Sequence, residues 1–204
     1  MNSSSIKVIF FDIGGVFLTN GWGHESRQKA AAEFGFEYDK MNELHDFIFN
    51  VYEIGRISLD EYLDTTVFNR PRDFTKEDFK AFMFAQSIEL PHMLQWIIEW
   101  KKRNNGRYKI FSINNEGKEL NDYRIKKYKL DQCFDGFISS CEVGMRKPDP
   151  GIFRIAMGIA HATPDQCIYF DDRSILVEAA AKLGIEGYHH IGFESSKRIL
   201  ENLK

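Results

Sequence analysis

The feature that most constrains the fold is an alternation of short apolar runs with segments of helical period. Five apolar runs, each bounded by polar or glycine residues, predict strands over residues 7–11, 108–111, 136–139, 167–170 and 187–191. Helical patterns over residues 91–103, 150–160 and 174–183 separate the later runs. Strands that alternate with helices form parallel sheets covered on both faces, so we predict an α/β protein with a doubly wound parallel sheet.

A helical insertion interrupts this alternation after the first strand. The segment between that strand and residue 91 has four helical patterns and no strand pattern, and two of the helices begin with capping boxes at Ser58 and Thr75. We therefore predict a small helical bundle over residues 20–89 and an α/β core built from residues 1–19 and 90–204. An insertion at this place in an open sheet would lie above the carboxyl ends of the strands, where such sheets bind ligands.

Composition narrows the class of protein. The 204 residues are 43% hydrophobic and 28% charged, with a formal net charge of -3, which is typical of a globular protein. Lys and Arg are spread along the chain, so we predict no nucleic-acid partner. No apolar run is long enough to cross a membrane, and the three cysteines lack disulfide or zinc spacing, so we expect a cytoplasmic protein with no membrane partner.

Polar residues follow the predicted strands. Asp12 follows the first strand, Ser112 the second, and Asp171 with Asp172 the fourth, while Lys147 precedes the helix that begins at residue 150. These side chains should meet at one edge of the sheet. Taken singly, Asp12 also fits an Asx turn and one of the paired carboxylates fits a helix cap. Together, carboxylates that hold Mg²⁺, a hydroxyl and a Lys suit phosphoryl transfer, with Asp12 as the attacking group.

The order of the segments that carry these residues resembles the haloacid dehalogenase (HAD) superfamily of hydrolases, across nearly the whole chain. FFDIGGV resembles the first motif of that superfamily, FSINN the second, GMRKPDPGIF the third and YFDDRSILVEAA the fourth. The insertion resembles the helical cap of the subclass whose cap follows the first strand. Within this subclass, the first motif is most similar to that of the alpha-glucose-1-phosphate phosphatase-like group.

The resemblance implies a Rossmann-like core and a Mg²⁺-dependent phosphatase that hydrolyses a small phosphate monoester, such as a sugar phosphate, through an aspartyl-phosphate. The catalytic residues it implies are Asp12, Ser112, Lys147 and Asp171. The metal ligands it implies are the Asp12 carboxylate, the main-chain carbonyl of Gly14, and Asp172. Asp171 would orient Lys147 or share the ion. We expect a small phosphorylated metabolite as the partner, and a monomer or homodimer.

Departures from the superfamily pattern leave two other functions open. Gly14 stands where most phosphatases of the superfamily have an Asp that acts as general acid and base, which predicts a preference for leaving groups that need no protonation. With Ile113 and Ile175, this departure would also suit a phosphate-ester binding protein that has lost turnover. A dehalogenase-type hydrolase likewise uses an Asp nucleophile, but metal-free dehalogenation gains nothing from the adjacent pair of carboxylates.

Specificity should come from the cap, because the core motifs contact only the phosphate. Aromatic and His side chains are the candidates, although each also fits the core of a helical bundle: Trp22, His24, His45, Phe49 and Tyr52. We also hypothesise that the glycine pair after Asp12 and residues 16–23 form a mobile flap. The pair at residues 189 and 190, both His, is interpreted as structural.

Overall fold

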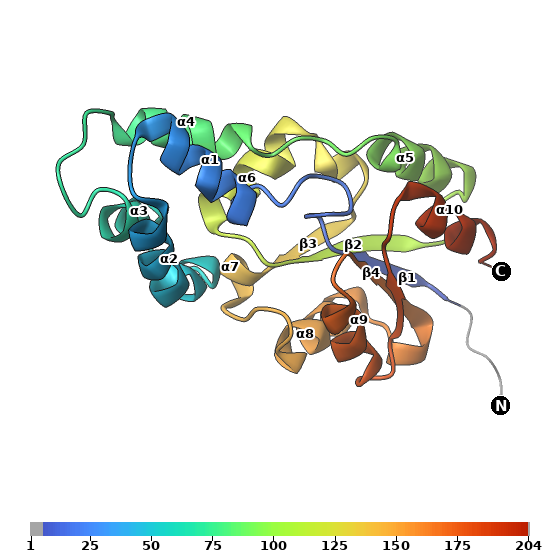
Figure 1. Cartoon of the computed structure of the whole chain (residues 1–204). Helices are drawn as coiled ribbons and strands as arrows, with labels where there is room; N and C mark the ends of the chain where they lie inside the picture. Colours follow the sequence, from blue (N-terminus) through green and yellow to red (C-terminus); the bar gives the residue numbers. More distant parts are fainter. Residues whose placement is uncertain (1–5, 204) are drawn as a thin grey trace.

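The computed structural model describes residues 6–203 and has an α/β core joined to a group of helices at one end (Figure 1). The strands form one parallel sheet in the order β3-β2-β1-β4-β5, which confirms the predicted fold class. They are β1 (Val8–Phe11), β2 (Lys109–Asn114), β3 (Gly136–Ser139), β4 (Cys167–Asp171) and β5 (Glu186–His189). The strand order reverses at β1, because β2 lies on one side of it and β4 on the other.

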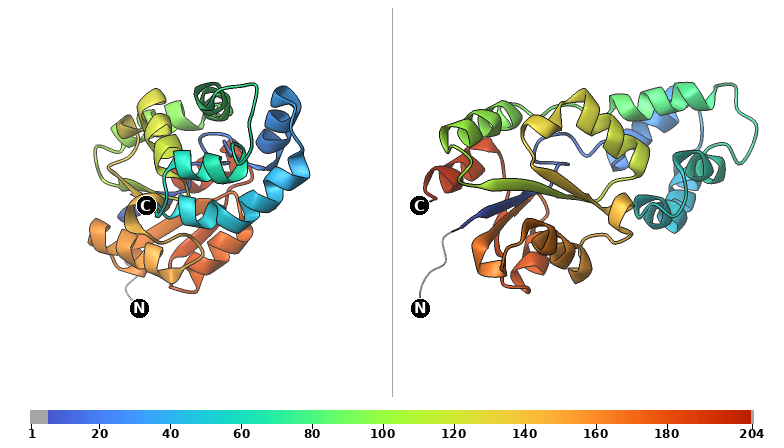
Figure 2. Two further views of the ribbon diagram at one scale, coloured as in Figure 1. Left: turned by 90° about the vertical axis from the view of Figure 1, so that its left-hand side faces the viewer. Right: turned by 180° about the vertical axis from the view of Figure 1, so that it is seen from behind.

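Helices cover both faces of this sheet (Figures 1 and 2). One face packs against α5 (Met93–Arg103), α6 (Lys118–Lys127) and α10 (Phe193–Glu201), and the other against α8 (Pro150–Ala160) and α9 (Ser174–Ala181). The remaining core elements are short: α7 (Ser140–Val143), η1 (Leu130–Gln132) and η2 (Pro164–Gln166). Helix α6 was not predicted because it reads KELNDYRIKK, whose few apolar residues hide the helical period.

The four helices between β1 and α5 form an apolar cluster separate from the two clusters beside the sheet, and Leu120 of α6 also belongs to it. They are α1 (His24–Phe34), α2 (Tyr38–Glu53), α3 (Leu59–Thr66) and α4 (Lys76–Ala85). The capping boxes predicted at Ser58 and Thr75 are present, and each hydroxyl accepts a backbone N–H three residues later. We refer to α1–α4 as the cap. The exact domain boundaries at residues 20 and 89 stay a prediction.

Close packing fastens the end of α2 to the core. A Cβ at Gly117, at the start of α6, would lie 2.1 Å from Cζ of Tyr52 in α2. At the same junction the Ser140 hydroxyl donates to the Glu53 carbonyl at 2.7 Å. Only a residue without a side chain fits at Gly117, so the backbone of the core packs directly against the Tyr52 ring of the cap at this point.

One buried Arg joins the core to both connections of the cap. Arg124 of α6 donates from Nη2 to the Thr19 carbonyl at 2.9 Å and from Nε to the Ser87 hydroxyl at 2.9 Å. Its Nη1 is ion-paired with Glu116 at 2.7 Å. Thr19 precedes the cap and Ser87 follows it, so a single guanidinium binds the chain where it leaves the core and where it returns.

Two expectations about local structure are wrong. The second strand continues to Asn114 rather than ending at residue 111, because Ile113 is buried in the sheet and the intervening Ser conceals the run. The flap hypothesis fails for Val16, Phe17 and Leu18, which are buried in the core cluster. Among the described residues, no helix is long and apolar enough to cross a membrane.

Candidate active site

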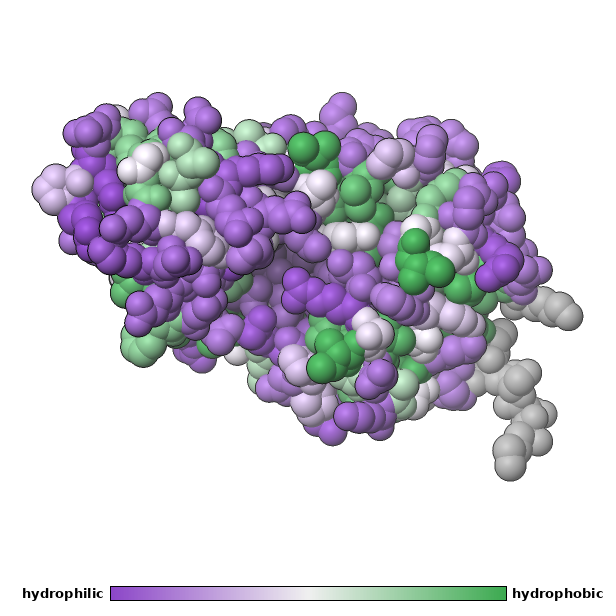
Figure 3. Space-filling model, in the orientation of Figure 1, coloured by the Kyte–Doolittle hydropathy of each residue, from purple (hydrophilic) through white to green (hydrophobic). Residues whose placement is uncertain are grey.

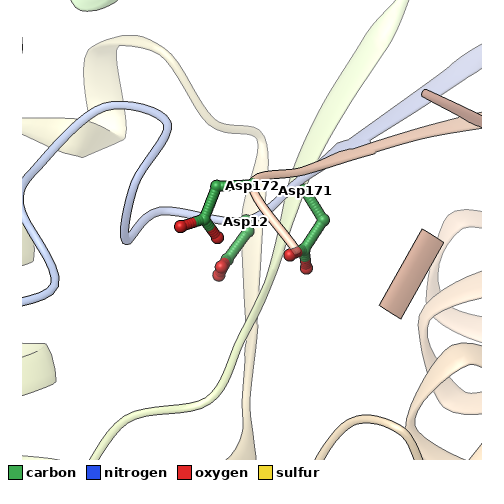
Figure 4. A group of neighbouring side chains, drawn as sticks. All are labelled: Asp12, Asp171 and Asp172. Carbon is green, nitrogen blue, oxygen red and sulfur yellow. The ribbon is translucent and has the colours of Figure 1, made fainter. Parts of the chain in front are cut away.

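Three carboxylates meet at the carboxyl ends of two adjacent strands, β1 and β4. Asp12 follows β1, Asp171 ends β4 and Asp172 comes next (Figure 4). Each offers an oxygen, and these oxygens all lie within 4.8 Å of one another. The site lies beside β1, where the strand order reverses and open α/β sheets bind their ligands. The sequence prediction that these three residues gather at one edge of the sheet is confirmed.

Lys147 lies among these carboxylates. Its Nζ is 3.0 Å from Asp12 Oδ1 and 2.8 Å from Asp171 Oδ2, and the residue is 1% exposed. Burial disfavours the charged ammonium, but the two carboxylates outweigh that effect and raise the pKa of Lys147. The site therefore holds a fixed, buried positive charge, which acts strongly on a nearby anion.

The hydrogen bonds of Asp171 favour the first of the two roles predicted for it. Its Oδ2 accepts from Lys147 and from the Tyr169 hydroxyl, and its Oδ1 accepts the Arg173 N–H at 2.9 Å. A carboxylate held by three donors orients the Lys and has little capacity left for an ion. Tyr169, which also accepts from Lys147 Nζ at 3.0 Å, is a site residue that sequence reasoning missed. It lies inside the β4 pattern and looks like an ordinary core aromatic.

Asp12 is bound on one oxygen only. Oδ1 accepts the Ile13 N–H at 2.8 Å and faces Lys147, while Oδ2 accepts no hydrogen bond from the described part of the chain. Burial raises the pKa of Asp12 to about 6; Lys147 opposes this shift and Asp171 adds to it. The free Oδ2 is thus the atom of Asp12 that is available to a phosphorus atom or to a cation.

The remaining oxygens at this edge fit a hard divalent cation. Asp172 Oδ1 is buried and has no hydrogen-bond partner among the described residues. The Gly14 carbonyl likewise accepts no hydrogen bond there, because the bridge to Leu18 uses the groups on either side of it. Carboxylate and carbonyl oxygens are the ligands that Mg²⁺ prefers. The donor set expected from the sequence, Asp12, Gly14 and Asp172, is therefore chemically suited to that ion.

Ser112 is not brought to this site in the way that the sequence suggested. It lies inside β2, is fully buried, and its Oγ has no partner among residues 6–203. Two residues later, Asn114 and Asn115 line the cavity above Asp12. Asn115 holds the Lys147 backbone from both sides, donating from Nδ2 to the Lys147 carbonyl at 2.9 Å and accepting the Lys147 N–H at 2.8 Å. The two adjacent Asn residues in FSINN were the sequence signal that could have indicated these two site residues.

A cavity of about 300 Å³ lies between these residues and the cap. Figure 3 shows a hollow on this face, surrounded by hydrophilic residues, between the cap and the core. Four of the five cap candidates line the cavity: Trp22, His24, His45 and Phe49. Tyr52 does not, because its ring is buried against Gly117 and its hydroxyl donates to Glu119 at 3.2 Å.

Sequence reasoning missed several charged residues of this cavity. Glu116 and Arg124 form a buried ion pair in its wall, and burial raises the pKa of Glu116 to about 7 although Arg124 opposes the shift. Glu53 of the cap pairs with Arg146, which precedes Lys147 in the third motif. None of these has a local pattern in the sequence, because each partner comes from a distant segment.

The pair at residues 189 and 190 is held by hydrogen bonds. The ring of His189 donates from Nε2 to the Asp172 carbonyl at 2.9 Å, and Nδ1 of His190 lies 2.7 Å from the Ser196 hydroxyl. In the described chain the only group of His, Cys, Asp or Glu with the spacing of a metal site is the three Asp residues. That the two His residues have a structural role stays a prediction.

Comparison with known proteins identifies the class that this fold and site define. The family model of haloacid dehalogenase-like hydrolases matches residues 6–184, so the chain belongs to that family and is a hydrolase. The chain is 27% identical to D-ribitol-5-phosphate phosphatase of Bacteroides thetaiotaomicron, over 90% of this chain and 91% of that protein.

Two further likenesses are narrower in scope. The chain is 32% identical to bifunctional epoxide hydrolase 2 of Mus musculus over 57% of its length, but spans only about a fifth (21%) of that relative. A HAD family enzyme from Bacteroides thetaiotaomicron, solved as a complex with magnesium and inorganic phosphate, superposes with a TM-score of 0.80 at 22% identity, covering 95% of this chain and 99% of that one. At this identity the superposition shows the shared fold.

Proposed function

We propose that the protein is a Mg²⁺-dependent phosphatase that hydrolyses a small phosphate monoester, such as a sugar or polyol phosphate. The observation that carries this proposal is the group of Asp12, Asp171 and Asp172 around buried Lys147, open to a polar cavity under the cap. The phosphatase relative that aligns over nine-tenths of the chain, and is named for a polyol phosphate, supports the same class of substrate.

In this proposal Asp12, the Gly14 carbonyl and Asp172 hold Mg²⁺, and Asp171 orients Lys147. The ion, when bound, would neutralise charge on the phosphate oxygens. We also propose Asn114 in place of Ser112 as the polar side chain of the second strand that contacts the phosphate. Asn114 Nδ2 donates one N–H to Asn121 Oδ1 at 3.2 Å. Its second N–H is left for a ligand in the cavity that Asn114 lines.

Hydrolysis then takes two displacements at phosphorus. Asp12 Oδ2 attacks in line, so that a bond from Asp12 to phosphorus forms while the bond from phosphorus to the alcohol oxygen breaks. A water molecule next attacks the aspartyl-phosphate, which releases phosphate and restores the carboxylate. Throughout, Lys147 faces the negative charge that develops on the transferred group. Gly14 supplies no proton to the departing alcohol, so esters with good leaving groups should react fastest.

Hydrolysis of para-nitrophenyl phosphate with Mg²⁺ tests the proposal, because its leaving group needs no protonation. We expect phosphate release that stops in EDTA and falls at least a thousandfold in Asp12→Asn. The matched control is Asp131→Asn, which makes the same change on the exposed short helix η1 and should keep full activity. Mg²⁺ should also raise the melting temperature of the native chain but not that of Asp172→Asn.

Two outcomes would overturn the proposal. Cleavage of a 2-haloacid that persists in EDTA would show a dehalogenase that uses Asp12 without a metal. Binding of a phosphate ester in calorimetry, with no release of phosphate from any ester, would show a binding protein without turnover.

A further inference from the structure

The cap contains a buried cation that has no anionic partner in the described chain. Arg27 of α1 is 8% exposed, and no carboxylate among residues 6–203 forms an ion pair with it. The other buried cations of the site are paired, Lys147 with two Asp residues and Arg124 with Glu116. A buried charge without a counterion is costly, so Arg27 stands out as the one whose partner is not supplied by the described residues.

The guanidinium of Arg27 is held in place by neutral acceptors. Its Nε donates to Asn42 Oδ1 at 3.1 Å and its Nη1 donates to the Trp22 carbonyl at 2.9 Å. The orientation of the Asn42 amide is fixed, because its Nδ2 donates to Asp46 at 3.1 Å. Nη2 has no acceptor in the described chain, and Arg27 lines the cavity above Asp12. The free N–H groups of a rigid guanidinium are therefore available to a ligand there.

A second polar group beside it is held by a chain of hydrogen bonds. Trp22 Nε1 can only donate, and it donates to the Tyr62 hydroxyl at 2.8 Å. The Tyr62 hydroxyl, which is fully buried, lies 2.7 Å from His45 Nδ1. Nδ1 is thus occupied within the cap, and Nε2 is the ring nitrogen that remains for a ligand.

His45 stays neutral at physiological pH. Burial, with the charge of Arg27 adding to it, lowers the pKa of His45 to about 3. Nε2 makes no hydrogen bond within the described chain, and His45 lines the same cavity as Arg27 and Asp12. The cap thus presents the free N–H groups of Arg27 and Nε2 of His45 to one cavity, opposite a floor formed by Asp12, Lys147 and Asn114. The cap carboxylate that also lines this cavity, Glu53, is ion-paired with Arg146.

We propose that Arg27 and His45 form a subsite for a second anionic group of the substrate. This inference rests on the proposed phosphatase function and narrows it to small phosphate esters whose alcohol also bears a carboxylate or a second phosphate. One end of such a molecule reacts at Asp12 while the other neutralises the unpaired charge of Arg27. Charge-assisted hydrogen bonds to a guanidinium are among the stronger polar contacts in proteins, so selectivity of roughly tenfold to a hundredfold is expected.

The test compares esters that differ only in this distal group. Glycerate 3-phosphate is paired with glycerol 3-phosphate for a carboxylate, and fructose 1,6-bisphosphate with fructose 6-phosphate for a second phosphate. Para-nitrophenyl phosphate, which has no distal anion, reports the basic activity. We expect kcat/KM for at least one anionic ester to exceed that of its neutral partner about tenfold or more, and the pair that shows it identifies the anion.

Variants then assign the selectivity to the subsite. Arg27→Gln and His45→Phe should each raise KM for the anionic ester at least tenfold, with kcat and the para-nitrophenyl phosphate activity nearly unchanged. Arg27→Lys should restore part of the selectivity, because it keeps the charge. The matched control is Lys29→Gln, which removes an exposed positive charge from the same helix and should change nothing.

The outcomes separate this inference from the proposed function. Equal kcat/KM for anionic and neutral esters, or an equal loss for every substrate in Arg27→Gln, would overturn the subsite, and the second result would mean that Arg27 contacts the transferred phosphate. If the native chain hydrolyses no ester, the phosphatase proposal fails by itself. Calorimetry with glycerate 3-phosphate and glycerol 3-phosphate then decides on the subsite, with equal affinity as the refuting result.

Discussion

Asn20 Oδ1 lies 2.6 Å from the position that a Cβ at Gly14 would take, so the side chain of Asn20 fills the space beside Gly14. Asn20 Nδ2 is also 3.4 Å from Asp172 Oδ2. Residue 14 therefore lacks an acidic side chain, and the Asn20 side chain occupies the space that such a side chain would need.

Restoring that acid in full should need two changes. Gly14→Asp alone has to push the Asn20 side chain aside, so we expect a smaller gain in kcat/KM than in the double variant. Gly14→Asp with Asn20→Ala should raise kcat/KM about tenfold or more for alkyl phosphates, which need a proton on the leaving oxygen, and little for para-nitrophenyl phosphate. A series of esters of rising leaving-group pKa measures this. If the rate declines with leaving-group pKa as steeply in the double variant as in the native chain, the prediction is contradicted.

The second strand offers a test of which side chain contacts phosphate. Asn114→Ala should lower kcat/KM for para-nitrophenyl phosphate at least tenfold, because Asn114 lines the cavity. Ser112→Ala should change it less than threefold, because the Ser112 hydroxyl is enclosed in the sheet. Steady-state kinetics of the two variants, with circular dichroism to check folding, distinguish them. A larger loss in Ser112→Ala would reinstate the role that the sequence suggested for that residue.

Removing the buried ammonium should destabilise the fold. Lys147→Met leaves Asp12 and Asp171 facing each other without a cation, which should cost about 3 kcal/mol or more in the free energy of unfolding at pH 7. The loss should shrink in acid, as the carboxyls take up protons. Urea denaturation measures it, and Lys126→Met on the exposed side of α6 is the control, expected within about 0.5 kcal/mol of the native chain. An equal effect of the two substitutions would refute this account.

The contact between the cap and the core predicts a collision. Gly117→Ala places a methyl group into the Tyr52 ring, which should cost about 1 to 3 kcal/mol in the free energy of unfolding. Gly158→Ala in α8 meets nothing within 4 Å and should be neutral or slightly stabilising. Thermal denaturation compares the two. Combining Gly117→Ala with Tyr52→Ala should remove the added cost, and simple additivity of the two effects would argue against the collision.

Acid should destabilise the protein through His45. Its folded pKa of about 3 lies below the ordinary value of 6.5, so the unfolded chain takes up a proton first and stability is lost as pH falls from 6.5 toward 3. This loss amounts to about 2 kcal/mol at pH 5. The free energy of unfolding is measured from pH 7 to pH 5 for the native chain and for His45→Phe. Over this range the native chain should lose about 2 kcal/mol more than the variant. Parallel curves would show that the pKa of His45 does not change on folding, and would contradict this account.

The sequence was sufficient for much of the fold and of the candidate site, for a physical reason. Asp12, Lys147, Asp171 and Asp172 each follow a strand or precede a helix, and topology alone brings such positions to one edge of a parallel sheet. The end of β2 was misplaced because Ser interrupts the apolar run. The corrected end of the strand is why we propose Asn114, rather than Ser112, as the phosphate contact.

Contacts between distant segments could not be predicted in the same way. Arg27 looks like any charged residue of an amphipathic helix until the fold shows that it is buried without a counterion. The hydrogen bond from Trp22 through Tyr62 to His45 joins three elements of the cap, and no spacing in the sequence encodes it. Periodicity locates elements, but the partners of His45 depend on which side chains of distant segments face one another.

The bonds of Arg124 to Thr19 and Ser87 limit how this cap can be exchanged. A chimera that replaces residues 20–89 with another cap would keep the Thr19 carbonyl but remove the Ser87 hydroxyl, so the guanidinium would lose one of these two acceptors. It would also have to keep residue 21 without a side chain, because a Cβ there would lie 2.2 Å from Arg124 Nη2. The core and the cap are in this respect a matched pair, so the junction has to be exchanged together with the cap and its selectivity.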